Sequence, residues 1–220
     1  MLTALGCLAA TEGTARADLF KGGVGVIGAF GGNFLDKPEG SATISPSYPG
    51  FGGITGGFGL ALDARFLGLV GVEIDIIRMT NKGHADIDVG SRSLTLNIQH
   101  DAWHIPVMLK GSLPLPLLSP FVVVGAEFVR TSDAAADVTD NAYPVAARTS
   151  NYTFFTAGLG LEIKLPIPAV DIRIPFSLRG SYYNMGDKVE DRGEFTNQRF
   201  TYDTRWKWQA LATLGAQYYF

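Results

Sequence analysis

The sequence has little of what most stabilising or binding chemistries require. Cys7 is the only cysteine, so neither a disulfide framework nor a cluster of thiolate metal ligands can form. The net charge is −3 and the pI about 5.6, so the chain carries no basic stripe of the kind that nucleic acid demands. No stretch approaches the roughly 18 uninterrupted apolar residues of a spanning helix. Nucleic-acid binding and a helical membrane protein are thereby excluded.

What the sequence does have is glycine and aromatic residues inside apolar segments of alternating character. It contains 27 glycines and 11% aromatic residues. In the last segment the even positions from Trp206 to Phe220 are apolar, whereas the odd positions from Lys207 to Tyr219 are mixed. Alternation over about 9–11 residues, with one face for lipid and one for a crowded interior, is typical of transmembrane barrel strands.

Seven earlier segments follow the same rule, which makes eight in all. Their outward residues are predicted to be Val24/Val26/Gly28/Phe30, Ile54/Gly56/Phe58/Leu60/Leu62, Val70/Val72/Ile74/Ile76, Trp103/Ile105/Val107/Leu109, Val122/Val124/Ala126/Phe128, Thr153/Phe155/Ala157/Leu159/Leu161/Ile163 and Val170/Ile172/Ile174/Phe176/Leu178. Eight is the smallest even strand number of membrane barrels. The sequence therefore predicts an all-β fold, an eight-stranded antiparallel up-and-down transmembrane β-barrel. Because an unpaired edge in hydrocarbon is costly, the sheet must close.

The connections between segments alternate in length, as they do in outer-membrane barrels, whose periplasmic turns are short and whose outer loops are long. Polar outer loops are predicted at 32–50, 80–92, 131–150 and 184–205, and compact turns at 63–68, 112–119 and 166–169. The fourth segment changes parity between Leu94/Leu96/Ile98 and Trp103/Ile105. A bulge near Gln99–Ala102 would reconcile the two halves.

The amino-terminal segment is apolar and small, and Ala15-Arg16-Ala17 has the form of a secretory cleavage site. We interpret residues 1–17 as a signal peptide, truncated at its start because a positively charged beginning is missing, and residues 18–220 as the barrel domain. Aromatic residues are expected at both ends of the strands, where the membrane meets water. The candidates are Trp103, Trp206 and Trp208 at the outer interface and Tyr218 and Phe220 at the inner one.

Several segments resemble the small outer-membrane β-barrel family that includes the OmpA transmembrane domain and OmpX. They are Ile105-Pro106-Val107-Met108-Leu109-Lys110, Pro120–Ala126, Ala157–Glu162 and the aromatic end Leu214–Phe220. The resemblance implies an outer-membrane location in a Gram-negative cell envelope, and a last strand that is recognised by the outer-membrane insertion machinery. We expect no peptidoglycan-binding domain after Phe220, so a wall-tethering role is not carried over from the resemblance.

Strand parity also predicts which ionisable side chains face the lumen. They are Asp63, Glu73, Asp75, Glu127, Glu162 and Asp171, against Lys110, Lys164, Arg173, Arg179 and Lys207. An eight-stranded interior is only just wide enough for side chains to fill, and buried charges persist when they are paired. We interpret this nearly balanced set as a salt-bridged plug. The alternative is a narrow ion path, which would make the protein a porin-like, low-conductance pore.

The sequence offers no clear catalytic or metal site, and we expect no cofactor and no enzyme activity. His100 and His104 are four residues apart, which on a strand separates them by ~13 Å, too far to chelate one ion. His104 is predicted to point inward, and His84 to lie in an outer loop. A lipid-modifying outer-membrane enzyme remains an alternative, although no serine neighbours either strand histidine in a recognisable motif.

Function is expected to reside in the outer loops, because binding residues concentrate on loops held by a rigid scaffold. The preferred hypothesis is a monomeric, envelope-stabilising surface barrel that presents loops 131–150 and 184–205 to lipopolysaccharide or an external ligand. Loop 184–205 mixes charges of both signs with aromatic residues, and could extend the last two strands above the membrane as a hairpin.

Overall fold

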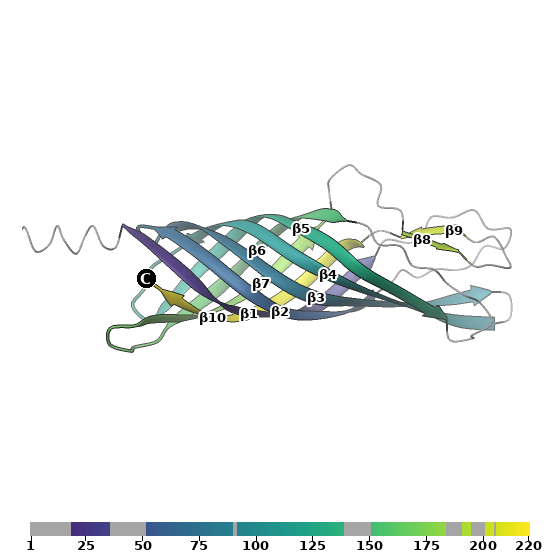
Figure 1. Cartoon of the computed structure of the whole chain (residues 1–220), viewed down its shortest axis with the longest axis horizontal. Helices are drawn as coiled ribbons and strands as arrows, with labels where there is room; N and C mark the ends of the chain where they lie inside the picture. The colour runs from purple at the N-terminus through teal and green to yellow at the C-terminus, as the bar shows by residue number, and fades with distance from the viewer. Residues whose placement is uncertain are drawn as a thin grey trace, which may run out of the picture.

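The chain forms a closed barrel of eight antiparallel strands, seen from the side in Figure 1. This computed structural model describes residues 19–35, 52–89, 92–138, 151–183, 191–194, 201–204 and 206–220. The barrel strands are β1 (Phe20–Leu35), β2 (Gly52–Phe66), β3 (Val70–Val89), β4 (Arg92–Ser112), β5 (Leu118–Val138), β6 (Tyr152–Lys164), β7 (Asp171–Tyr182) and β10 (Trp206–Tyr219). The predicted fold class is confirmed. The predicted signal peptide, residues 1–17, lies outside the described residues.

The barrel closes where the first strand meets the last. β1 pairs with β10 in a continuous register from Gly23↔Tyr219 to Phe34↔Trp208. Two reciprocal backbone hydrogen bonds finish this seam: Phe220 N donates to Gly22 O at 2.9 Å, and Gly22 N donates to Phe220 O at 3.2 Å. Every strand of the barrel therefore has two neighbours, which is what hydrocarbon requires of a sheet.

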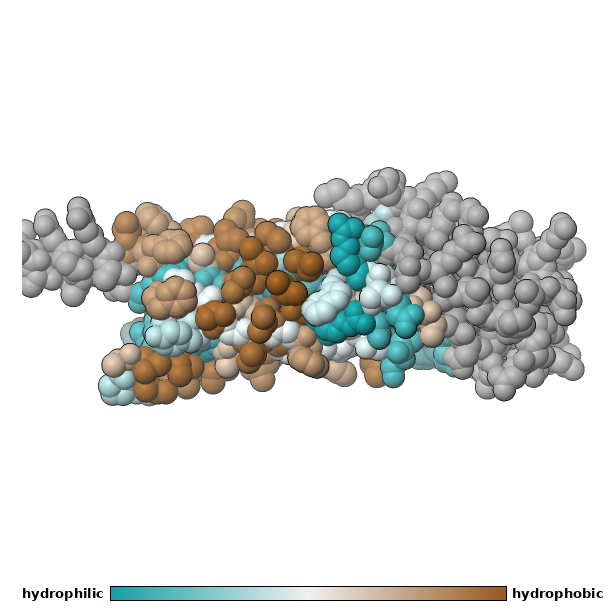
Figure 2. All heavy atoms as spheres, viewed as in Figure 1, coloured by the Kyte–Doolittle hydropathy of each residue, from teal (hydrophilic) through white to brown (hydrophobic). Residues whose placement is uncertain are grey.

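The outer wall is apolar and the inner wall is mixed, with polar side chains and buried apolar ones, as the alternation predicts. In β1, for example, Val26 is 59% and Phe30 63% exposed, whereas the intervening Ile27 and Ala29 are buried. Figure 2 shows the resulting apolar belt over the half of the barrel nearer the short turns, with polar side chains beyond it. No helix among the described residues is long and apolar enough to cross a membrane.

The turns at one end of the barrel are short, as predicted. They join β2 to β3, β4 to β5 and β6 to β7. Leu67 (φ 53°), Gly68 (φ 68°) and Ala169 (φ 64°) adopt the left-handed conformation that lets the chain reverse there. Because short turns lie on the periplasmic side of outer-membrane barrels, this end is taken as periplasmic and the opposite end as extracellular.

At the extracellular end the prediction of a loop at 80–92 is wrong. β3 and β4 instead continue as a regular hairpin as far as the pair Val89↔Arg92. β5 accompanies them up to the pair Leu96↔Val138, so the start of the predicted loop 131–150 is also strand. The first residues of the predicted loop 32–50 likewise belong to β1. The remaining parts of these two predicted loops, 36–50 and 139–150, lie outside the described residues.

The irregularity predicted near Gln99–Ala102 exists, but the extra residue is on the neighbouring strand. The β3–β4 register runs through this region without a shift. The β4–β5 register shifts between Asp101↔Asp133 and Ala102↔Thr131, so Ser132 is the inserted residue. Within the predicted loop 184–205, the described segments β8 (Asp191–Glu194) and β9 (Thr201–Thr204) pair as a separate two-stranded sheet.

Candidate functional site

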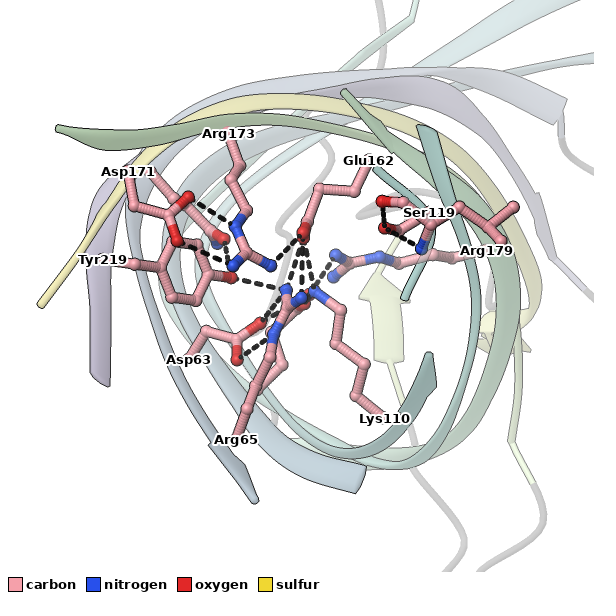
Figure 3. Close-up of polar contacts among 12 residues, drawn as sticks. Asp63, Arg65, Lys110, Ser119, Glu162, Asp171, Arg173, Arg179 and Tyr219 are labelled. Atoms are coloured by element: carbon pink, nitrogen blue, oxygen red, sulfur yellow. Dashed lines mark hydrogen bonds and ion pairs between the residues drawn. The ribbon is translucent and has the colours of Figure 1, made fainter. Parts of the chain in front are cut away.

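The lumen is the part of the molecule where ionisable side chains gather. Arg65, the second-last residue of β2, lies at the periplasmic end of the lumen. It donates two hydrogen bonds of 2.9 Å to Asp63, from Nε and Nη2. The same guanidinium donates to both carboxylate oxygens of Glu162 on β6, with Nη1 at 2.8 Å from Oε1. Figure 3 shows Arg65 at the centre of this group. A planar fork of donors suits such bidentate pairing with carboxylates.

A second arginine repeats this arrangement beside the first. Arg173 on β7 holds Asp171 with two hydrogen bonds of 2.8 Å and donates a third, also of 2.8 Å, to Glu162 Oε1. The ring of Tyr219 lies close to both guanidinium groups, 4.8 Å from that of Arg65 and 4.3 Å from that of Arg173. Tyr219 therefore contributes two cation–π contacts, and its hydroxyl accepts a hydrogen bond from Arg65 at 2.5 Å.

Deeper in the barrel, two cations bridge three carboxylates. Lys110 Nζ donates to Asp63 at 2.8 Å and to Glu73 at 2.5 Å. Arg179 donates to the other oxygen of Glu73 at 2.7 Å and to Asp75 at 2.6 Å. Residues of β2, β3, β4 and β7 are thereby joined across the lumen. Lys110 is 1% and Asp75 0% exposed, so this layer is closed to solvent.

The next layer toward the outside is built around Glu127 of β5. Its Oε1 lies 2.5 Å from Nδ1 of His104, and its Oε2 accepts hydrogen bonds from Thr156 and Ser181. Nε2 of His104 lies 3.1 Å from the amide nitrogen of Asn81. Both ring nitrogens of His104 are therefore engaged, and the hydroxyl of Ser181 bonds to the acid, so no serine–histidine pair is formed.

On the extracellular side of this layer, the lumen contains uncharged amide and hydroxyl side chains, which we call the amide layer. Asn33 donates to Asn81 at 3.2 Å, Thr55 donates to the same oxygen at 2.5 Å, and Gln209 donates to Asn33 at 2.8 Å. Two buried oxygens, Asp75 Oδ1 and Gln209 Oε1, have no hydrogen-bond partner among the described residues.

The structure brings most of the sequence-predicted lumen residues into one network. Eight of them take part in it: Asp63, Glu73, Asp75, Lys110, Glu162, Asp171, Arg173 and Arg179. Glu127 also faces the lumen but belongs to the separate layer that it forms with His104. The other two lie at the mouths. Lys164 is 46% exposed and 3.9 Å from Asp171, and Lys207 is half-buried near the outer end of β10. Arg65, Tyr219 and the coupling of His104 to Glu127 were not predicted.

The predicted interface aromatics lie on the outer wall where their side chains are described. Trp103 is 43%, Trp208 50%, Tyr218 48% and Phe220 74% exposed. The ring of Trp208 packs against that of Tyr182 at a tilt of 41°, with centroids 4.3 Å apart, and Arg78 lies over the ring of Trp103 at 5.6 Å. The side chain of Trp206 is outside the described set. Amphipathic rings in such positions favour the boundary between lipid and water.

In the part of the chain that the structure describes, no group of three or more His, Cys, Asp or Glu side chains is arranged to hold a metal ion. The geometry of the lumen is instead that of a cross-linked plug. Each carboxylate is paired with a cation or with hydroxyl and imidazole donors, which is the condition for keeping charges out of water.

A closed eight-stranded barrel with an apolar outer belt and a polar interior is the architecture of an integral outer-membrane β-barrel protein, and this chain resides in the outer membrane. Its fold is that of the small outer-membrane barrels. The chain is similar to the outer membrane protein OprG of Pseudomonas aeruginosa, with a TM-score of 0.58 and 12% identity over 91% of this chain and 95% of that one.

Two other small barrels superimpose more loosely. The N-terminal barrel domain of Pseudomonas aeruginosa OprF has a TM-score of 0.39 at 16% identity, covering 90% of this chain and 97% of that one. The attachment invasion locus protein Ail of Yersinia pestis has a TM-score of 0.41 at 14% identity, covering 90% and 99%. No protein-family model and no curated protein sequence matches the chain. At these identities the likeness to OprG shows the fold alone.

Proposed function

We propose that the protein is a structural outer-membrane barrel that stabilises the envelope and presents its extracellular face to lipopolysaccharide or an external ligand. The observation that carries this proposal is the closed layer of Asp63, Lys110, Glu73 and Arg179 across the lumen. A barrel whose interior is filled by paired charges is a rigid support rather than a conduit. Its binding surface is then the extracellular end, where β3, β4 and β5 continue as strands.

Planar-bilayer recording tests this assignment. Because the side chains of the Lys110 layer are buried and paired across the lumen, purified protein reconstituted at neutral pH is expected to give no reproducible single-channel steps. The informative variant is Arg179→Ala/Glu73→Ala, which removes two large side chains from that layer while conserving net charge. Steps that appear only in this double variant would show that the layer is the barrier. Steps in the unaltered protein that change with Glu73→Gln would overturn the proposal.

A low-conductance pore is the second candidate, and one observation favours it. Polar side chains occur in the lumen from the amide layer to the arginines. Asp75 Oδ1 and Gln209 Oε1, which have no hydrogen-bond partner in the described part of the chain, are where buried water would bind. A hydrated path would need only limited side-chain movement around these atoms. The recordings described above separate the two candidates.

For the outer surface we propose lipopolysaccharide as the partner. Arg78, Trp103 and Arg130 are direct cross-strand neighbours on β3, β4 and β5, and Trp103 and Arg130 are exposed on the outer wall. Arg78 donates to Ser132 at 2.5 Å and is 3.6 Å from Asp101, so its position is fixed. Guanidinium groups beside an interfacial tryptophan are suited to the phosphates of lipid A.

Removing the charges of Arg78 and Arg130, which we call the arginine row, should reduce lipopolysaccharide binding. In Arg78→Gln/Arg130→Gln the amount of lipopolysaccharide that co-purifies with the barrel is expected to fall at least about tenfold for each arginine removed, since one charge-assisted hydrogen bond is worth roughly 1.5–3 kcal/mol. The matched control is Lys21→Gln/Lys164→Gln, which removes the same charge at the opposite mouth. Equal retention by both double variants would refute the assignment.

We further propose that the barrel has no catalytic activity and acts as a monomer. The engaged ring nitrogens of His104 and the complete pairing of the eight barrel strands support these two proposals. We also propose that the last strand is recognised by the insertion machinery. Lipid A from cells with and without the protein should have identical acylation by mass spectrometry, and light scattering should give the mass of one chain. A changed acylation pattern would reopen the lipid-modifying alternative.

A further inference from the structure

Glu127 differs from the other carboxylates of the lumen in what balances its charge. Each of the others has an arginine or a lysine within ion-pair distance; they are Asp63, Glu73, Asp75, Glu162 and Asp171. Glu127 is 2% exposed. Among the described residues its ion-pair partner is His104, with 2.5 Å between Oε1 and Nδ1. A directly bound cation therefore compensates its charge only when the imidazole carries two protons.

The groups around this pair are uncharged or paired elsewhere. Oε2 of Glu127 accepts hydrogen bonds from the hydroxyls of Thr156 and Ser181. Arg179, one layer toward the periplasm, donates to Glu73 and Asp75. The titratable and charged groups that line the lumen on either side of the pair are Glu73 and Asp75 of β3, His100 and Lys110 of β4, Tyr152 of β6, Arg179 of β7 and Lys207 of β10. A lone buried carboxylate is costly, so this position favours uptake of a proton.

The hydrogen bonds on the other side of His104 decide where its protons lie. Asn81 Oδ1 accepts hydrogen bonds from Asn33 Nδ2 at 3.2 Å and from Thr55 Oγ1 at 2.5 Å. The nitrogen of the same amide is the atom that lies 3.1 Å from His104 Nε2. An amide nitrogen only donates, so Nε2 accepts. In this arrangement the ring is neutral, its proton is on Nδ1, and the charge of Glu127 has no cation beside it.

A doubly protonated ring requires the amide layer to run in the opposite direction. Nε2–H then donates to Asn81 Oδ1, so this amide turns over and its nitrogen faces Thr55 and Asn33. Asn33 and Gln209 must turn over as well, because they are joined by a hydrogen bond of 2.8 Å from Gln209 Nε2 to Asn33 Oδ1. Turning an amide exchanges a nitrogen for an oxygen of nearly the same size. The reversed chain also supplies a donor to Gln209 Oε1, which lacks a hydrogen-bond partner among the described residues.

We propose that the lumen contains a proton-operated switch, in which His104 binds a second proton opposite Glu127 and the hydrogen bonds of the amide layer reverse. The two arrangements differ in charge and in the direction of the amide chain, whereas the side chains occupy the same space. Imidazole changes its charge between about pH 5 and pH 8, and a two-state element biased by one charge is what a pH sensor requires. The switch lies inside the barrel and is independent of the arginine row on the outer wall.

Nuclear magnetic resonance of the isotope-labelled, full-length barrel in detergent tests this proposal. The ring nitrogens distinguish a neutral imidazole with its proton on Nδ1 from a doubly protonated one. His104 is expected to give the first pattern at about pH 8 and the second at about pH 5. The side-chain amide signals of Asn81, Asn33 and Gln209 should change over the same interval. A ring that keeps one protonation state throughout, or amide signals that do not follow the ring, would overturn the proposal.

Two variants separate the charge of Glu127 from the shape of the site. In Glu127→Gln an amide oxygen can still accept from Nδ1, but half-protonation of His104 should need at least about tenfold more protons, the worth of one charge-assisted hydrogen bond. Asp133→Asn, at an exposed position of the same strand, is the control and should titrate as the unaltered protein does. Asn81→Asp places a carboxylate at Nε2 and should keep the ring doubly protonated at about pH 8. Equal titration of Glu127→Gln and Asp133→Asn, or a neutral ring in Asn81→Asp, would refute the switch.

Discussion

Replacing Lys110 with methionine is expected to lower the free energy of unfolding by about 3–5 kcal/mol, the usual cost of removing one partner from a buried ion pair. Methionine has a similar length but no donor. Asp63 and Glu73 would lose hydrogen bonds of 2.8 Å and 2.5 Å that no water can replace in a layer this deeply buried. Urea unfolding of the barrel in lipid vesicles, followed by tryptophan fluorescence, measures the change.

The control for this substitution is Lys82→Met, an exposed lysine on the extracellular part of β3. It should change stability by no more than about 0.5 kcal/mol. A second variant separates charge from shape. Lys110→Met/Glu73→Gln removes one of the two carboxylate charges that lose the lysine and should recover part of the loss. If Lys110→Met alone is as stable as Lys82→Met, the lumen network does not hold the barrel together as described.

Replacing Gly59 with valine is expected to cost at least about 3 kcal/mol, at the upper end of overpacking penalties, and to reduce the folded fraction. A Cβ atom at this position would lie 1.9 Å from the backbone oxygen of Ile76 and 2.7 Å from the Cα atom of Ile77. Both are backbone atoms of the paired strand, so β2 and β3 would have to separate. The yield of heat-modifiable, compact barrel on gels reports this effect.

The matched control is Gly56→Val on the same strand. There the nearest atoms to an added Cβ, on Ala29 and Phe30, are at 3.6 Å, an ordinary contact. By strand parity Gly56 faces lipid, where extra methyl groups are tolerated. Equal yields from the two valine variants would contradict the close approach of β2 to β3.

The alternation of side chains in the membrane could be predicted from sequence because it is a local property. Within the belt each outward residue must be apolar, so a period of two is imposed on every strand. The exposed faces Val24 to Phe30 and Val122 to Phe128 agree with that prediction. Closure of the sheet into a barrel could be predicted without further information, since an open sheet would leave unpaired amides in hydrocarbon.

Outside the belt the same rule fails, because water tolerates polar residues on both faces of a strand. Residues 80–89 therefore look like a loop in the sequence but form the end of β3. The bulge on β5 at Ser132 was also beyond local prediction. It depends on which residues of two strands are opposite each other, and only the register fixes that.

The missed members of the lumen network show the same limit. Arg65 was assigned to a turn, although continuing the alternation of Leu60 and Leu62 through Ala64 to Phe66 places it inside the barrel. The pairing of His104 with Glu127 was even harder to predict from the sequence. These residues are on different strands and are not direct cross-strand partners, so their contact depends on how side chains cross the lumen.

The seam between β1 and β10 has a consequence for the order in which the molecule is made. The two strands that complete the cylinder are the first and the last barrel strands along the chain, so the final backbone partners of β1 are synthesised after all the others. A partly exported chain can form hairpins, but its sheet has two edges with unpaired backbone amides, which would be costly in lipid. Insertion must therefore await the whole polypeptide, and until then the apolar strands need protection from one another in the periplasm.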